Sequence, residues 1–498
     1  MQKFAKKIVI ALILIMPLAM FLSYHPIISL GSDAAMNFEI NIAEIWLILF
    51  FLASLPFIKN IVKFYGPKKL VLAALVPAYF TLSIIWSTNR VRTLLTAGLF
   101  WLIIFAALSL IYWLRTNSYD KKTCPTKKLG AALLITSIGV SIFCWVQCLL
   151  DLAGVGREYT LLCPGCVSTK FGFPHPNGFA IEPQFMGNLL IAPVLLCFYL
   201  LISPRVQKDF EKRSQKIFLT ITAIFLTTTL FLTFSRGAIY AFALSLLLEI
   251  ILVFIQHRKE TAKSTKSKQK KTTNFKIVIR PVIISIVAFA ASLTAQGIFA
   301  SISTTSDTFF SGITKSIHQL SLGKIDFRPE ENKVSSPTGE TIESEVNDQV
   351  SNAPSQFSGY VSESTDTRLS LNQIAIRTWR SKPQYLLVGT GLGGAGVAMN
   401  QAYPEELGPK EIVQNEYISL LLETGLLGCL LILVVVIIAI RFLCQSGKNC
   451  LFPLFISVVL AFAITLSFFS GLPNAIHIYL FPIIFIGLSG AKNNTIIK

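Results

Sequence analysis

The chain has 498 residues, of which 53% are hydrophobic and only 14% are charged, and its mean hydropathy is +0.62. This composition excludes a soluble globular domain of ordinary make-up and indicates a polytopic membrane protein. The net charge of +18 does not indicate a nucleic-acid partner, because the basic residues gather in alternate loops between apolar segments.

Apolar segments long enough to cross ~30 Å of hydrocarbon as helices recur along the whole chain. We therefore predict an all-α fold with about twelve transmembrane helices. The predicted spans are residues 8–24, 42–58, 69–86, 93–114, 129–150, 184–202, 217–234, 238–256, 277–300, 415–440, 450–470 and 476–490. They divide the chain into an N-terminal scaffold with an outer loop (1–183, loop 155–183), helices six to nine (184–300), one large loop (301–414) and the C-terminal helices (415–498).

The positive-inside rule orients these spans, because cytoplasmic loops carry an excess of lysine and arginine. Basic residues are dense in 115–128, 205–216 and 257–276 and sparse in the short loops that alternate with them, so both termini are expected in the cytoplasm and 301–414 outside. The run 8–24 lacks a small-residue cleavage site, which favours a retained helix over a signal peptide. Segment 257–276 is expected to attract anionic membrane lipids.

The first five predicted helices contain few polar residues and no close pair of charges, so we expect them to act as a scaffold. In the outer segment 157–185, Cys163 and Cys166 allow a local disulfide, whereas a redox motif lacks its usual strand and helix context. Glu182 precedes the sixth span beside apolar residues. It is either a carboxylate with a raised pKa suited to proton transfer or an interfacial cap of that helix.

Only three residues, Ser235-Arg236-Gly237, separate the spans 217–234 and 238–256. Arg236 is thus held at the outer membrane surface. A cation there is costly unless it is paired or hydrated, which favours a functional role. The alternative is an arginine whose side chain reaches the lipid headgroups.

In the large loop, residues 330–366 are rich in Ser, Thr and Glu and are predicted to be disordered. Apolar residues at three- and four-residue spacing then predict a helix over 368–380, with Arg368 at its start and Arg377 and Arg380 on one flank. Such a helix either presents its arginines to a ligand or rests on the bilayer with arginines at the headgroups.

A glycine cluster, GTGLGGAG, follows at 389–396 and contains the spacing GxGxxG. A dinucleotide fold is excluded because no βαβ unit surrounds it. Gly391 and Gly393 either let backbone N–H groups approach a diphosphate or let the loop turn sharply back to the membrane.

The span 415–440 begins beside two side-chain amides, Gln414 and Asn415, which offer hydrogen-bond donors and acceptors. Glu416 and Glu423 lie seven residues apart, about two helical turns, and are therefore expected on similar faces of this helix. Polar groups thus gather where the large loop re-enters the membrane.

These residues resemble the O-antigen ligase and O-antigen polymerase superfamily of bacterial inner-membrane enzymes. The ligase pattern is a histidine and a polar residue, then nine residues, a glycine, two residues and a final small or polar residue. Asn415, Gly425 and Gly428 match it, although Gln414 occupies the position of the histidine. The sequence around Arg236, FSRGA, and the segment 367–393 resemble the family's helix-end arginine and its arginine-led loop helix.

Family members transfer glycans from undecaprenyl diphosphate with inversion at the anomeric carbon and without a metal or cofactor. The resemblance therefore implies a glycosyltransferase in the bacterial cytoplasmic membrane, with an undecaprenyl-diphosphate glycan donor and a glycan or lipid acceptor. A chain-length regulator is a candidate partner. Arg236, Arg368 and Arg380 would then bind the diphosphate, and Gly391, Gly393 and Asn415 would support the site.

Gln414 cannot accept a proton at neutral pH and is left to orient an acceptor hydroxyl. Glu182 is then the best-placed replacement for the base, ahead of His175, His318 and His477. The missing histidine favours a polymerase over a lipid A ligase. A transporter or flippase that uses the same arginines as a substrate path is the alternative function, and a structural membrane subunit leaves Arg236 unexplained.

Overall fold

The computed structural model describes residues 2–22, 28–30, 38–116, 125–163, 165–204, 213–262, 270–303, 308–321, 356–407, 413–445 and 451–468. Within these ranges, ten segments are long and apolar enough to cross a membrane. They are formed by α1 (Gln2–Phe21), α2 (Ile42–Ser54) with η1 (Leu55–Phe57) and α3 (Ile58–Tyr65), α4 (Pro67–Leu82) with η2 (Ser83–Ile85), α5 (Arg90–Thr116), α6 (Pro125–Leu152), α9 (Pro183–Ile202), α11 (Arg213–Leu232), α12 (Arg236–Ala262), α13 (Lys270–Ile302) and α18 (Glu416–Gln445).

These ten segments correspond to ten of the predicted spans, and the all-α membrane fold is confirmed. The predicted span 450–470 contains a shorter apolar helix, α19 (Phe452–Thr465). The predicted span 476–490 lies outside the described residues, so the count of twelve is not confirmed. The one sheet in the described part is a short antiparallel hairpin of β1 (Ile28–Leu30) and β2 (Phe38–Ile40).

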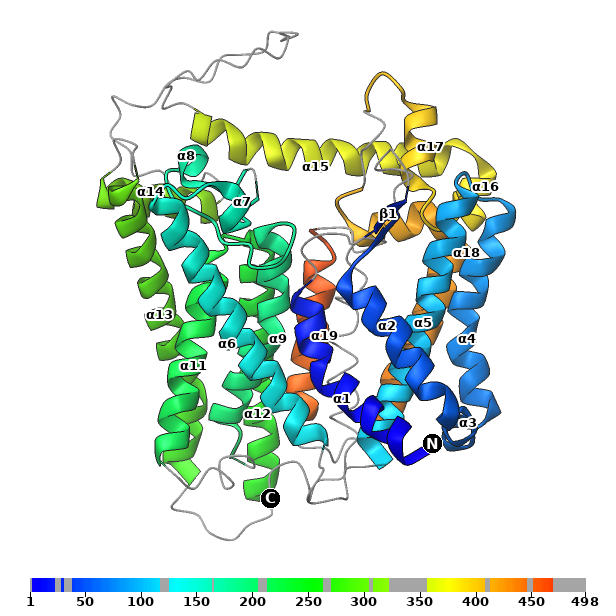
Figure 1. Ribbon diagram of the computed structural model, residues 1–498, viewed down its shortest axis with the longest axis horizontal. Helices are drawn as coiled ribbons and strands as arrows, with labels where there is room; N and C mark the ends of the chain where they lie inside the picture. Colours follow the sequence, from blue (N-terminus) through cyan, green and yellow to red (C-terminus); the bar gives the residue numbers. More distant parts are fainter. Residues whose placement is uncertain are drawn as a thin grey trace.

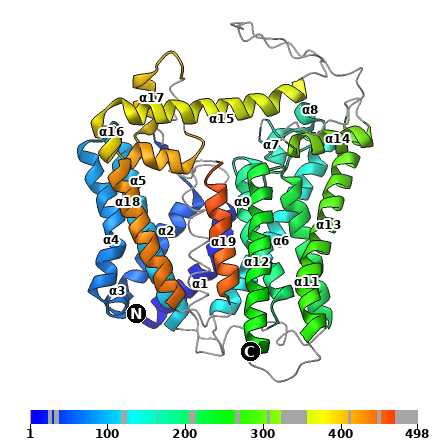
Figure 2. The same cartoon turned by 180° about the vertical axis from the view of Figure 1, so that it is seen from behind.

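Helix α15 (Gln356–Ser381) lies across one end of the bundle, and we call this end the α15 face (Figure 1). The bundle beneath it has two groups of helices, α2, α4, α5 and α18 on one side and α6, α9, α11, α12 and α13 on the other. Figures 1 and 2 both show α19 between the two groups. Five short helices lie at the α15 face: α7 (Arg157–Thr160), α8 (Ser168–Phe171), α14 (Phe309–Leu320), α16 (Pro383–Val388) and α17 (Ala395–Ala402).

Helix α9 is apolar on all sides, and a helix of this kind is buried among its neighbours. It therefore occupies the centre of one group. It is buried along almost its whole length and packs against α11, α12 and α19. Other spans, such as α4 and α18, expose many apolar side chains, as expected for helices that contact lipid. The ends of α9 and its neighbours are therefore held in fixed positions at the α15 face.

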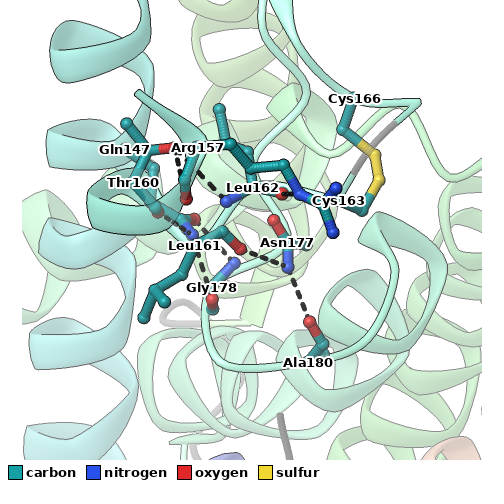
Figure 3. The surroundings of a disulfide bond; sticks show 10 residues. All are labelled: Gln147, Arg157, Thr160, Leu161, Leu162, Cys163, Cys166, Asn177, Gly178 and Ala180. Atoms are coloured by element: carbon teal, nitrogen blue, oxygen red, sulfur yellow. Dashed lines mark hydrogen bonds between the residues drawn. A yellow bond between two sulfur atoms is a disulfide. The ribbon is translucent and has the colours of Figure 1, made fainter. Parts of the chain in front are cut away.

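The loop between α6 and α9 is ordered by side-chain bonds from the end of α6 (Figure 3). Gln147 donates to the carbonyl oxygens of Thr160 and Gly178, and its own oxygen accepts the N–H of Gly178. Cys163 and Cys166 form the local disulfide that the sequence allowed. The loop ends at Pro183, where α9 begins.

The start of α15 differs from the prediction in two ways. Residues 356–366 were predicted to be disordered but form the first turns of this helix, and residues 330–355 lie outside the described ranges. The sequence of these turns has Phe357, Tyr360 and Val361 at helical spacing, which continues the apolar pattern that follows. Arg368 consequently lies in the middle of α15 and not at its start.

Candidate functional site

The C-terminal end of α19 is contacted by four other helices at the α15 face. The last carbonyl groups of a helix have no partner within it. Here the carbonyl of Leu466 accepts the backbone N–H of Glu416 at 2.9 Å, and that of Ser467 accepts the Asn415 amide at 3.0 Å. The carbonyl of Phe468 accepts a bond from the Gln184 amide at 3.1 Å. The starts of α9 and α18 are thereby tied to the same turn.

Arg368 reaches this turn from α15. Its guanidinium donates to the carbonyl of Phe468 at 3.3 Å and to the side-chain oxygen of Gln184 at 3.2 Å. Since Gln184 also bonds to Phe468, the three residues form a closed triangle. A guanidinium has five N–H donors, so this arrangement orients Arg368 and leaves donors for an anionic ligand.

The start of α12 lies against the same turn. A Cβ atom added at Gly237 would lie 3.1 Å from the ring of Phe468, so Phe468 contacts the first turn of this helix. Arg236 is the first residue of α12 and is half-buried. Arg368 and Gly237, the neighbour of Arg236, therefore both contact Phe468, so the two arginines predicted from the sequence as parts of one site come from helices that meet at this residue.

The turn before Arg236 has a strained backbone. Phe234 is buried and has φ +54°, a left-handed conformation that costs a residue with a Cβ about 1–2 kcal/mol. Its ring stacks on His175 with a centroid distance of 5.1 Å. Burial lowers the pKa of His175 to about 3, so its ring is neutral near pH 7. His175 thus supports the strained turn that precedes Arg236, whereas the sequence had suggested it as a weak candidate base.

Three helix N-termini meet around the end of α19, namely those of α9, α12 and α18. Free N–H groups and the helix dipole make such ends positive. Together with two guanidinium groups they create a positive region that suits a diphosphate. Gln414 lies at the edge of this region, half-buried, and its side chain has no hydrogen-bond partner among the described residues.

Glu182 lies at the N-cap of α9, two residues from Gln184, and is exposed. Its side chain makes no capping hydrogen bond. The apolar enclosure that the sequence suggested is not formed, although the residue does lie at the same end of α9 as the Arg368 triangle. Glu182 therefore remains a candidate base by position. His318 is buried in α14, and His477 lies outside the described residues.

Arg380 is separated from this region. It lies twelve residues beyond Arg368 on α15, about 18 Å along the helix axis, and is exposed. Arg377, on the same stretch, pairs with Glu406 at 2.9 Å and lies over the ring of Tyr403. The structure thus brings Arg236 and Arg368 together but not Arg380.

The glycine cluster forms a sharp turn that is bonded to a break in α18. Gly425 has φ +63° and ψ −174°, which interrupts the helix and frees carbonyl groups in the turn before it. The carbonyls of Leu422 and Glu423 accept the N–H groups of Thr390 and Gly391 at 2.9 and 3.0 Å. These bonds favour the second reading of the glycines, a turn back to the membrane, and give Gly391 an indirect supporting role.

A buried cluster of charges lies beneath this turn, and the sequence did not predict it. The N–H groups of Gly393 and Ala395 bond to Glu423, and Arg92 and Glu416 lie close enough to interact electrostatically with that carboxylate. Arg92, Glu416 and Glu423 are all buried. Glu416 and Glu423, which were expected on similar faces of α18, lie close enough to interact electrostatically. Arg92, at the start of α5, interacts with Glu423 of the distant helix α18.

This cluster connects the two parts of the site. Glu416 follows Gln414 and Asn415 at the start of α18, whereas Glu423 is held by the glycine turn. Arg92 also packs along the turn, since a Cβ atom at Gly393 would lie 3.0 Å from its Cγ atom. Thr93, next to it, donates to the carbonyl of Leu392 at 2.6 Å. Helix α5 therefore fixes the position of the start of α18.

Residues 221–433 match a family model described as O-Antigen ligase. The matched segment contains Arg236, Arg368, the glycine turn and Gln414. The comparison with curated proteins gives no match.

Proposed function

We propose that this chain, which belongs to the O-antigen ligase and polymerase superfamily, is an inverting glycosyltransferase that uses an undecaprenyl-diphosphate-linked glycan as donor. The observation that supports this most strongly is the shared contact of Arg368 and the start of α12 with Phe468. Two permanent cations at the end of a membrane bundle suit a ligand that has a lipid tail and a diphosphate.

Catalysis follows from where negative charge develops. As the bond between the anomeric carbon and the phosphate oxygen breaks, charge increases on the departing diphosphate. Groups that are already positioned to receive this charge stabilise the transition state. Arg368, oriented by Gln184 and Phe468, and Arg236 at the positive end of α12 have this role in our proposal. Bidentate geometry favours arginine over lysine here.

The acceptor hydroxyl attacks from the opposite side of the sugar, which inverts the anomeric carbon. Gln414 orients this hydroxyl through its unengaged amide, and Glu182 is our candidate for taking its proton. The amide in place of a histidine favours a polymerase, in which the acceptor is another lipid-linked glycan. Lipid-linked glycans of this kind are used outside the cytoplasm, so in our proposal the α15 face lies on the outer side of the cytoplasmic membrane. Lys59, Lys63, Lys68 and Lys69 lie near the opposite end, as the excess of positive charge on the cytoplasmic side requires.

The purified protein in detergent, mixed with purified lipid-linked repeat units, tests this function. We expect longer lipid-linked glycans to form without any second membrane compartment. A transporter would leave the repeat units unchanged in this assay. Absence of elongated or transferred product, with correctly folded protein and both donor and acceptor present, would contradict the proposal.

A further inference from the structure

A second polar cluster lies deep in the bundle, far from the arginine site. Glu249 lies near the middle of the span Arg236–Lys259, about 20 Å along α12 from Arg236. It is fully buried, and neither carboxylate oxygen has a hydrogen-bond partner among the described residues. An ionisable residue inside a membrane span is costly and points to a ligand or a functional role.

Two serine hydroxyls accompany this carboxylate. Ser245 lies four residues before Glu249 and hence on the same face of α12. Ser457 of α19 lies at a similar depth. The start of α12 and the end of α19 meet where Gly237 contacts Phe468, and Glu249 and Ser457 each lie about three helical turns from this contact. Both serines are fully buried, and their Oγ atoms have no hydrogen-bond partner in the described part of the chain.

These hydroxyls do not use the usual partner of a hydroxyl in a membrane helix. Thr227, Thr228 and Thr229 of α11 each donate to the carbonyl four residues earlier. Ser245 and Ser457 make no such bond. Other buried serines also lack partners, but these two share a face or a depth with an unpaired carboxylate. A buried polar group without a partner costs about 1–3 kcal/mol, so three of them at a similar depth on two helices that pack together point to a bound species.

The surroundings limit what that species is. Helices α9, α12 and α19 pack against one another around this level, and Cys197 of α9 is close enough to Glu249 to interact with it electrostatically. Arg280 of α13 donates to the carbonyl of Leu201, and no ion pair joins it to Glu249. One carboxylate with hydroxyl oxygens is a set of hard ligands that carries a single negative charge, which suits a small cation of charge +1.

We propose that Glu249, together with Ser245 and Ser457, binds an alkali cation at the centre of the α9, α12 and α19 packing. The same three helices carry Gln184, Arg236 and Phe468 at their ends. A cation at this position therefore stabilises the helices that hold the arginine site. This site is independent of the glycan chemistry, so its test requires no substrate.

The test measures thermal unfolding of the purified full-length protein in detergent, in NaCl, KCl or choline chloride at equal ionic strength. We expect NaCl or KCl to raise the unfolding midpoint in a saturable manner over choline chloride. Glu249→Gln is expected to abolish this response, and Ser457→Ala to weaken the apparent affinity about tenfold, the effect of about 1.4 kcal/mol. Binding of ²²Na⁺ to the same samples reports occupancy directly when sodium is the cation.

Glu44→Gln is the matched control, because Glu44 is also buried in a membrane span but accepts the N–H of Asn41 at 2.8 Å. It is expected to keep the full cation response. Equal unfolding midpoints of the wild-type protein in all three salts would overturn the proposal, as would an unchanged response in Glu249→Gln. If Glu249→Gln does not fold, the wild-type titration and Ser457→Ala decide the question.

Discussion

Arg368→Ala is expected to lower the rate of glycan elongation by about 10²–10³-fold, because it removes a preoriented cation from the departing diphosphate. Arg236→Ala is expected to have an effect of similar size. Arg368→Lys retains the charge but not the fork of donors, so it restores only part of the rate. The measurement is the initial rate of elongation with purified lipid-linked repeat units, at matched amounts of folded protein.

Arg377→Ala is the matched control for Arg368, since it removes an arginine from the same helix. Arg377 is half-exposed and pairs with Glu406, an interaction that contributes about 0–1 kcal/mol to stability. We expect its elongation rate to stay within about twofold of the wild type, because a pair of this kind contributes so little. An equal loss of elongation rate in Arg377→Ala and Arg368→Ala would mean that the positive charge of α15 contributes as a whole and that Arg368 has no specific role.

The second large effect is expected at the buried charges beneath the glycine turn. Arg92→Leu leaves the buried carboxylate of Glu423, which also lies near Glu416, without the cation that interacts with it. Removing one partner of a buried charge pair costs about 3–5 kcal/mol. We therefore expect Arg92→Leu to be unfolded at much lower concentrations of sodium dodecyl sulfate in mixed micelles, and to lose elongation because the start of α18 shifts.

Glu423→Gln is expected to be much milder than Arg92→Leu. Its amide oxygen still accepts the N–H groups of Gly393 and Ala395, and the change removes the repulsion between Glu423 and Glu416. Arg90→Leu, two residues from Arg92 but exposed, serves as the control and is expected to match the wild type. A ranking in which Glu423→Gln is the more damaging change would show that Arg92 is not the central charge of this cluster.

The membrane fold and part of the site follow from local sequence signals. Apolar length predicted about twelve spans, ten of which correspond to long apolar helices in the described residues, because every helix that crosses lipid must be long and apolar. Arg236 was predictable because it is the charged residue in a three-residue break between two apolar runs. Arg368 was predictable as part of an amphipathic helix, although the length of α15 and its place in the middle of that helix were not.

The remaining parts of the site depend on contacts between distant segments. Arg92 and Glu423 lie in distant segments of the chain, and nothing local in the sequence shows that they interact. The end of α19 binds Arg368, Gln184 and Asn415 through backbone carbonyls, which side-chain identity does not reveal. Arg380 has the same local pattern as Arg368, and only the length of the helix separates it from the site.

The central claim is that Arg236 and Arg368 together hold the diphosphate of the carrier lipid. Its most direct test is the affinity of the purified protein for undecaprenyl diphosphate and undecaprenyl monophosphate, measured for the wild type and for Arg236→Ala with Arg368→Ala. We predict that the wild type prefers the diphosphate and that the double variant loses this preference while still binding the lipid tail. An unchanged preference for the diphosphate in the double variant would contradict the account.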